Sequence, residues 1–252
     1  MTIGYVYIVG AGPGDPELIT LRGLKALQKA DVVLYDRLVP RELLNYVPEH
    51  AEKIYVGKEP GKHTYTQEEI IEIIVDRAQR GKTVVRLHGG DPFLFGRGFE
   101  EYAELVKRGI PCEVIPGITS AIAVPEAYGI PIVLRGYASS VAIVTGTEDP
   151  KKGRKFVDFR KIAQVVDTII ILMGAHRLPE IVEELLQAGK PENTPIAILR
   201  KYIEPELKII TTLKEAKNLN IQPPVIILIG NVIQAYLELN EKGKGTTITL
   251  NK

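Results

Sequence analysis

The chain has 252 residues, of which 45% are hydrophobic and 25% charged, and its formal net charge at pH 7 is +1. This composition is typical of a soluble globular protein, and the balanced charge argues against a general nucleic-acid binder. Apolar runs such as Val225–Gly230 are too short to span a bilayer, and we expect no signal peptide at the N-terminus. The single cysteine, Cys112, excludes an internal disulfide and suits a reducing cytoplasm. The four histidines lack ligand spacing, so we predict no metal site.

The first half of the chain alternates β-rich runs with segments of helical period. Strands are predicted at Tyr5–Val9, Asp31–Tyr35 and Thr83–Leu87, and a further short strand begins at Cys112. One helix is expected from about Pro16 to Lys29, with leucines along one side. Another begins after Thr66 as N-cap and stops at Gly81. This alternation predicts an α/β fold with a largely parallel sheet.

A second series of elements follows the loop Leu134–Ser140. Its predicted strands and helix are Val141–Gly146, Thr168–Gly174, Leu178–Gly189 (the helix), Thr194–Leu199, Leu207–Leu213 and Pro224–Gly230. The loop is the natural boundary, so we expect two α/β domains, residues 1–137 and 138–252. The cleft between two such domains is a common location for a ligand.

The loop after the first strand, Gly10-Ala11-Gly12-Pro13-Gly14, has the form G-x-G-x-G rather than the dinucleotide pattern G-x-G-x-x-G. Pro13 has no N–H to offer a phosphate, and Asp15 and Glu17 would repel one. The loop therefore lets a ligand approach the backbone closely, but this ligand is not expected to be a diphosphate. The alternative is a tight strand-to-helix turn without a ligand.

Two more loops follow predicted strands. Gly89-Gly90-Asp91-Pro92 places glycines and a carboxylate at the end of one strand, and Thr119-Ser120 opens the helix after another. Open sheets bind ligands at the carboxyl ends of their strands, so the three loops are expected to form one site. For Asp91 alone, an Asp-Pro turn without a ligand remains the alternative.

Long stretches of the chain resemble the tetrapyrrole C-methyltransferases. They are "VYIVGAGPGDPELITLRGLKALQKADVVLYDRLV", "VGK" at Val56–Lys58, "GGDPFLFGRG" and "PGITSA". The similarity is collinear from Tyr5 to about Arg135 and looser to Gly230, and "YDRLV" is most similar to members that methylate uroporphyrinogen III. The resemblance implies transfer of methyl groups from S-adenosylmethionine (SAM) to C-2 and C-7 of that substrate. The expected products are precorrin-2, for siroheme or cobalamin, and S-adenosylhomocysteine.

The resemblance also implies a cytoplasmic homodimer that holds SAM in the cleft between its domains, and it assigns residues to this cofactor. The SAM contacts that it implies are Pro13, Gly89, Gly90, Asp91, Leu94, Thr119, Ser120, Met173 and Tyr202. It assigns Asp36 as proton acceptor and Lys58 as proton donor. Without the resemblance, Asp36 could equally be a turn residue or a partner of Arg37, and Lys58 a solvated lysine.

The substrate carries eight carboxylates, so its pocket is expected to be basic. Candidate contacts in or beside the site loops are Arg37, Lys58, His88, Arg97 and Arg135, although each alone could be a surface charge. Three residues depart from the pattern of the family. His88 stands where lysine is usual, Tyr202 fills a glycine position, and Thr147 replaces a common histidine.

Three other functions remain open at this point. One is a methyltransferase of the same fold that acts on a later corrin intermediate, an RNA or a protein, against which "YDRLV" argues. Another is an NAD-dependent oxidoreductase, which the interrupted glycine pattern opposes. The last is a tetrapyrrole or SAM-binding protein without catalysis. We expect a small-molecule partner and neither a nucleic acid nor a membrane.

Overall fold

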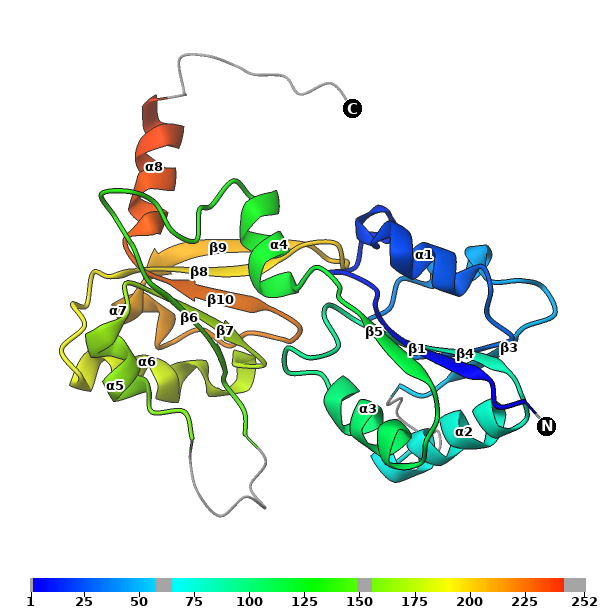
Figure 1. Ribbon diagram of the computed structural model, residues 1–252. Helices are drawn as coiled ribbons and strands as arrows, with labels where there is room; N and C mark the ends of the chain where they lie inside the picture. Colours follow the sequence, from blue (N-terminus) through cyan, green and yellow to red (C-terminus); the bar gives the residue numbers. More distant parts are fainter. Residues whose placement is uncertain (1, 58–64, 149–155, 243–252) are drawn as a thin grey trace. The chain divides into compact units, whose positions relative to one another are not determined.

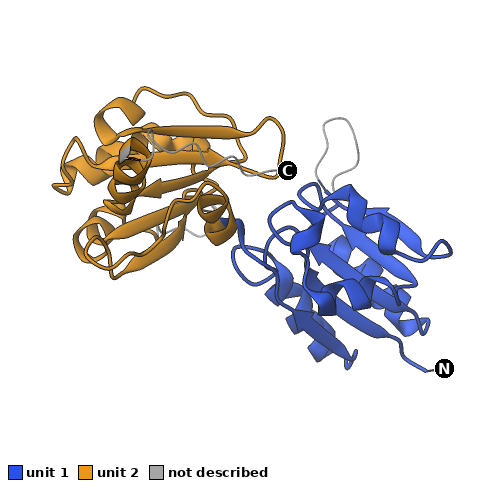
Figure 2. Ribbon diagram, turned by 90° about the horizontal axis from the view of Figure 1, so that it is seen from above, with its two compact units in different colours: residues 1–120 blue, residues 121–252 orange. Residues whose placement is uncertain are grey.

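The computed structural model describes residues 2–57, 65–148 and 156–242, and the chain divides into two compact units, residues 1–120 and 121–252 (Figure 2). The first unit contains β1 (Tyr5–Gly10), a 3-10 helix (Pro16–Leu18), α1 (Leu21–Leu27), β2 (Val32–Tyr35), a second 3-10 helix (Arg41–Tyr46), β3 (Glu52–Tyr55), α2 (Gln67–Gln79), β4 (Thr83–His88), α3 (Gly98–Lys107), β5 (Cys112–Ile115) and the first residue of α4 (Ser120–Ala127). The second contains the rest of α4, β6 (Val141–Thr145), α5 (Phe159–Val165), β7 (Thr168–Leu172), a 3-10 helix (Ala175–Arg177), α6 (Leu178–Gln187), β8 (Pro195–Arg200), β9 (Leu207–Thr212), α7 (Leu213–Ala216), β10 (Ile226–Ile229) and α8 (Val232–Lys242).

The first unit is built on a parallel sheet of strand order β3-β2-β4-β1-β5, as the sequence predicts. Its strands are rich in valine, isoleucine and leucine because both faces are covered. Helices α2 and α3 cover one face, and α1 with the segment Arg41–Tyr46 covers the other (Figure 1). Because every strand runs the same way, all five carboxyl ends lie at one edge of this sheet.

The predicted limits of α2 are confirmed. Thr66 Oγ1 accepts the Glu69 amide at 3.2 Å, and the Glu69 carboxylate accepts the Thr66 amide at 2.7 Å, which completes a capping box. Gly81 follows the helix with φ of +79°, a left-handed conformation that glycine adopts without strain.

The predicted helix from Pro16 to Lys29 is wrong in its first half. Asp15 caps a 3-10 turn, the chain then becomes extended, and α1 starts at Leu21. Thr20 causes the second start because its Oγ1 accepts the amide of Gly23 at 3.0 Å. Asp15 therefore caps the short turn and Glu17 lies within it, and neither residue is at the start of α1.

The second unit has a mixed sheet of order β6-β7-β10-β8-β9. Among the described strands of this sheet, β6 and β7 pair in parallel and the other neighbours are antiparallel. Helices α5, α6 and α7 pack on one face, and α4 and α8 on the other (Figure 1). Since β10 runs against both β7 and β8, the strands β6, β7 and β8 end at the same edge.

The boundary between the units falls at Ser120, earlier than the predicted loop Leu134–Ser140. Helix α4 explains the difference, because Ala121 and Val124 belong to the same buried cluster as Ile170 and Leu228 of the second sheet. The sequence places this helix with the preceding strand, but its apolar side chains pack in the second unit. Within the described ranges, no helix is long and apolar enough to cross a membrane.

Candidate functional site

The two glycine-rich loops of the first unit meet at the carboxyl edge of its sheet. Gly12 and Gly90 form a two-way bridge, with N···O distances of 3.3 Å from Gly12 and 2.7 Å from Gly90. The amide of Ala11 also donates to the His88 carbonyl at 2.7 Å. The loops are adjacent because β1 and β4 are neighbouring parallel strands.

The loop after β5 joins the same cluster. A Cβ on Gly117 would lie 2.2 Å from the Gly90 carbonyl oxygen, and one on Gly10 would lie 2.5 Å from the Gly117 backbone. Asp91 Oδ2 accepts the Gly117 amide at 3.1 Å. Three strand ends are therefore held together by contacts that only glycine permits, as the sequence predicts.

Asp91 and Gly90 play different parts in this cluster. Asp91 Oδ1 accepts the amides of Phe93 at 2.8 Å and Leu94 at 3.1 Å, so the carboxylate shapes its own loop. Gly90 has φ of +68°, and a Cβ there would have no described atom within 4 Å. The loop thus leaves open space at Gly90, where a ligand can approach the backbone.

The other predicted SAM residues of the first unit are partly accessible or buried. Pro13 is buried, whereas Leu94, Thr119 and Ser120 are half-buried. Ser120 opens α4, as expected from the sequence.

Asp36 follows β2 at the same edge, and its side chain is 29% exposed. Its Oδ1 accepts the Leu38 amide at 3.2 Å, and Oδ2 lies 3.6 Å from Arg86 Nη2. Gly57 packs against this turn, since a Cβ there would lie 2.7 Å from the Arg37 amide nitrogen. Lys58, the predicted proton donor, lies outside the described residues.

Beneath Asp36 lies a buried ionic cluster that the sequence analysis missed. Glu101 is fully buried and accepts hydrogen bonds from Arg86 Nε at 3.0 Å and Gln67 Nε2 at 2.9 Å. His88 Nε2 lies 2.7 Å from its other oxygen. Burial by itself raises the pKa of Glu101, but the His88 hydrogen bond and the Arg86 charge outweigh it and lower the pKa to about 2. The available signal was Arg86 within "TVVRLH", because a charge in a strand covered on both faces needs a partner.

This cluster changes the interpretation of His88. The sequence assigns His88 to substrate carboxylates, but the residue is only 4% exposed and its ring contacts Glu101. Arg37, Arg97 and Arg135 are exposed, the last of them in the second unit. Arg97 pairs with Glu100, whose hydrogen bond raises the Arg97 pKa.

The predicted residues of the second unit, Met173 and Tyr202, follow β7 and β8 at one edge of the mixed sheet. Both have a left-handed backbone, with φ of +55° and +65°. The φ of Tyr202 agrees with its place at a glycine position. Thr147, where histidine is common, donates from Oγ1 to the Met173 carbonyl at 2.8 Å.

Arg200 supports the segment that carries Tyr202. Its guanidinium donates to three carbonyl oxygens, those of Pro224 at 2.9 Å, Pro205 at 3.0 Å and Gln222 at 2.8 Å. The two chain segments beside Tyr202 are thus joined through one side chain. Sequence reasoning missed Arg200 because its partners are backbone groups, which no motif reveals.

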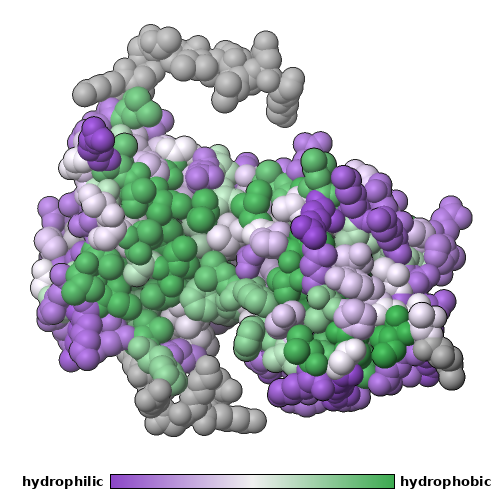
Figure 3. Space-filling view, in the orientation of Figure 1, coloured by the Kyte–Doolittle hydropathy of each residue, from purple (hydrophilic) through white to green (hydrophobic). Residues whose placement is uncertain are grey.

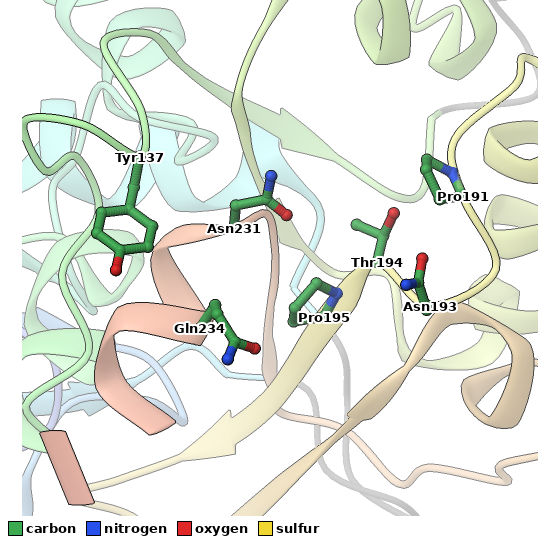
Figure 4. A pocket seen from close by; sticks show the side chains of 7 residues that line it. All are labelled: Tyr137, Pro191, Asn193, Thr194, Pro195, Asn231 and Gln234. Atoms are coloured by element: carbon green, nitrogen blue, oxygen red, sulfur yellow. The ribbon is translucent and has the colours of Figure 1, made fainter. Parts of the chain in front are cut away.

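Figure 4 shows a surface pocket of the second unit. It includes Pro195, the first residue of β8, whereas Met173 follows the end of β7, so the two lie at opposite edges of the sheet. The pocket is lined by Tyr137, Pro191, Asn193, Thr194, Pro195, Asn231 and Gln234. None of the predicted site residues belongs to this lining. Among the described residues, no group of three His, Cys, Asp or Glu side chains could hold a metal ion.

Comparison with known proteins identifies the family. Residues 5–217 match the tetrapyrrole (corrin/porphyrin) methylases. The chain is also 53% identical to the uroporphyrinogen-III C-methyltransferase of Methanocaldococcus jannaschii over 236 residues, which cover 91% of this chain and 97% of that protein. The chain therefore belongs to the tetrapyrrole methylases, and the resemblance noted in the sequence is confirmed.

Solved structures agree with this assignment. The uroporphyrin-III C-methyltransferase of Thermus thermophilus in complex with S-adenyl homocysteine has a TM-score of 0.79 and 38% identity, over 92% of this chain and 95% of that one. A cobalt precorrin-4 methyltransferase gives 0.80 and 33%, over 91% and 95%. The similar scores show that the fold is shared by members with different substrates. The structural scores alone therefore do not identify the substrate.

Proposed function

We propose that the protein is a SAM-dependent C-methyltransferase that methylates uroporphyrinogen III at C-2 and C-7 to give precorrin-2, for siroheme or cobalamin. The observation that carries the proposal is the convergence of three glycine-dependent loops beside Asp36. The 53% identity to a relative named for this activity supports the choice of substrate.

The open backbone at Gly90 fits SAM better than a dinucleotide. SAM has no phosphate, so it needs neither a set of free amides nor a positive helix end. In the first unit we assign Pro13, Gly89, Gly90, Asp91, Leu94, Thr119 and Ser120 to SAM. Met173 and Tyr202 keep the assignment that the resemblance gives them.

SAM supplies an electrophilic methyl group on a sulfonium. A ring carbon of the tetrapyrrole supplies the electron pair of the new C–C bond. The S–CH₃ bond breaks at the same time, and the electrons of that bond stay on sulfur to give S-adenosylhomocysteine. Asp36 then accepts the proton that leaves the methylated ring system, which balances the charge brought by the methyl group, and Lys58 keeps the proton-donor assignment that the resemblance gives it. Arg37, Arg97 and Arg135 are proposed to pair with substrate carboxylates.

We further propose that the protein acts as a homodimer in the cytoplasm. Figure 3 shows apolar side chains gathered on one face of the second unit, which supports an interface. The large exposed apolar residues of this unit include Ile122, Val133, Leu134 and Val141. Light scattering at micromolar concentration is expected to give twice the mass of one chain. A monomer would contradict this part of the proposal.

The test of the function is mass spectrometry of the product from uroporphyrinogen III and SAM. Two added methyl groups are expected, and no change in mass would refute the proposal. Cobalt precorrin-4 is offered in a parallel reaction, because the fold is shared with its methyltransferase. Preferential methylation of cobalt precorrin-4 would show that the protein acts on a later corrin intermediate.

An Asp36→Asn variant tests the assignment of the base. SAM affinity is expected to stay within a few-fold, and turnover to fall by about 10²–10⁴. Methyl transfer at the wild-type rate would show that Asp36 is only a turn residue.

A further inference from the structure

Arg86 occupies a position where a charge is costly. It lies in the middle strand β4, level with Leu34 of β2 and Ile8 of β1, and is only 4% exposed. A buried guanidinium persists only when its donors have partners. The partners of Arg86 therefore indicate what the residue does.

Two of its nitrogens are bound to fixed groups. Nε donates to Glu101 Oε1 at 3.0 Å, and Nη1 donates to the Leu87 carbonyl at 3.0 Å. The guanidinium is planar and rigid, so these two bonds also set the direction of Nη2. Nη2 lies 3.6 Å from Asp36 Oδ2.

The sheet itself brings Arg86 and Asp36 to the same face. Side chains alternate along a strand, so Asp36, two residues beyond Leu34, emerges on the face of Leu34 and Arg86. Helices α2 and α3 cover this face and supply Gln67 and Glu101. A continuous series of polar contacts thus runs from the helices through Arg86 to Asp36.

Each oxygen of the Asp36 carboxylate faces a partner of its own. The Leu38 amide donates to Oδ1, and the Arg86 charge faces Oδ2, while 29% of the side chain stays exposed. We propose that Arg86 is a positioning residue that orients Asp36 for proton acceptance, with Glu101 holding Arg86 in place. The inference rests on the proposed function of Asp36.

A double-mutant cycle separates this role from a purely structural one. Arg86→Met is expected to lower the single-turnover rate of methyl transfer about tenfold or more, with SAM affinity within a few-fold. In the Asp36→Asn background the same change should alter the rate less than about twofold, because the group it positions is already disabled. An equal effect of Arg86→Met in both backgrounds would overturn the inference.

Arg86→Met also leaves Glu101 buried with fewer partners, which can destabilise the fold. The cycle is therefore repeated in the Glu101→Gln background, where Arg86→Met leaves two neutral side chains and the amide introduced at position 101 can still bond Gln67. There too, Arg86→Met is expected to lower the rate less when Asp36 is replaced by Asn than when it is present. Arg77→Met is the control, because its ion pair with Glu52 lies on the outside of α2 and should not affect the rate in either background.

The outcomes distinguish this inference from the proposed function. If the wild type transfers no methyl group, the proposed function fails. If it is active and Asp36→Asn is harmless, the base assignment fails and the inference with it. If Asp36→Asn is slow and Arg86→Met acts additively, only the positioning role is wrong.

Discussion

The two units place their candidate residues at strand ends in different ways. In the first unit all strands are parallel, and three loops are locked together through Gly10, Gly90 and Gly117. In the second unit most neighbours are antiparallel, and the residues in question, Met173 and Tyr202, hold left-handed conformations without being glycine.

The difference follows from strand direction. A parallel sheet brings every loop that follows a strand to the same edge, so these loops can contact one another, and close contact requires glycine. In the mixed sheet β10 runs the other way, so Met173 and Tyr202 are supported individually. Thr147 holds the carbonyl of Met173, and Arg200 ties the segments beside Tyr202. Glycine loops are visible in a sequence, whereas support of this kind is not.

The buried cluster beneath Asp36 is expected to give the largest effect and is specific to the first unit. Glu101→Gln leaves Arg86 buried without its ionised partner, which should cost about 3–5 kcal/mol of folding free energy. Urea unfolding followed by circular dichroism measures the loss. A change below about 1 kcal/mol would mean that the pair contributes little to the first unit.

The difference in stability between the wild type and Glu101→Gln is expected to depend on pH. The folded-state pKa of Glu101 is lowered from its ordinary 4.5 to about 2, so its contribution is present above about pH 4.5 and is lost as the pH falls toward 2. The stability difference between wild type and Glu101→Gln should therefore shrink over this range, by about 3 kcal/mol. A difference that stays constant with pH would contradict the lowered pKa.

Gly117→Ala tests the contact between loops. The new Cβ would lie 2.2 Å from the Gly90 oxygen, so the backbones must separate, at a cost of about 2–3 kcal/mol. Gly136→Ala in the second unit is the control, because its φ is +87° but no described atom lies within 4 Å of the added carbon. Gly117 itself has no left-handed φ, so a loss at Gly117 no larger than the loss at Gly136 would show that the loops accommodate the added carbon at little cost.

Most of the first unit was predictable, because local rules and packing agree there. Buried β-rich runs gave the strands, Thr66 gave the start of α2, and the glycine loops gave the meeting of three strand ends. The break before α1 was not predicted, since Thr20 competes as a cap with a continuous leucine pattern. The place of α4 was missed because apolar side chains do not reveal which sheet they will cover.

Long-range polar contacts were the other gap. The sequence placed Asp36 at a strand end, but nothing local connects Arg86 with Glu101, 15 residues away on a helix. His88 was assigned to the substrate because an isolated histidine beside a glycine loop gives no indication of a buried partner. Nothing in the sequence indicated the left-handed backbone of Met173, because methionine rarely adopts that conformation.

Gly90→Ala sharpens the distinction between a structural glycine and one that faces a ligand. Gly90 and Gly109 have φ of +68° and +67°, and neither has a described atom within 4 Å of an added Cβ. Alanine at either position should therefore cost about 1 kcal/mol of stability. Calorimetry with SAM should show at least about tenfold weaker binding, roughly 1.4 kcal/mol, for Gly90→Ala alone. Equal SAM affinities of the two variants would place the ligand elsewhere.

The smallest expected change in stability is at Met173, where glycine should be more stable than alanine, the reverse of the usual order. Its φ of +55° is held because Thr147 bonds the Met173 carbonyl and because Gly174 packs on Gly146, where a Cβ would lie 2.3 Å away. A residue with a Cβ is strained there, so Met173→Gly should be more stable than Met173→Ala by about 1 kcal/mol, although alanine is usually the more stable of the two. Both variants lack the Met173 side chain beyond Cβ, so the difference in stability between them reports the backbone strain.

The control is Leu239, exposed on α8. There the usual order should hold, with alanine more stable than glycine by about 1 kcal/mol. The same order at both positions in thermal unfolding would show that the left-handed backbone of Met173 is not strained.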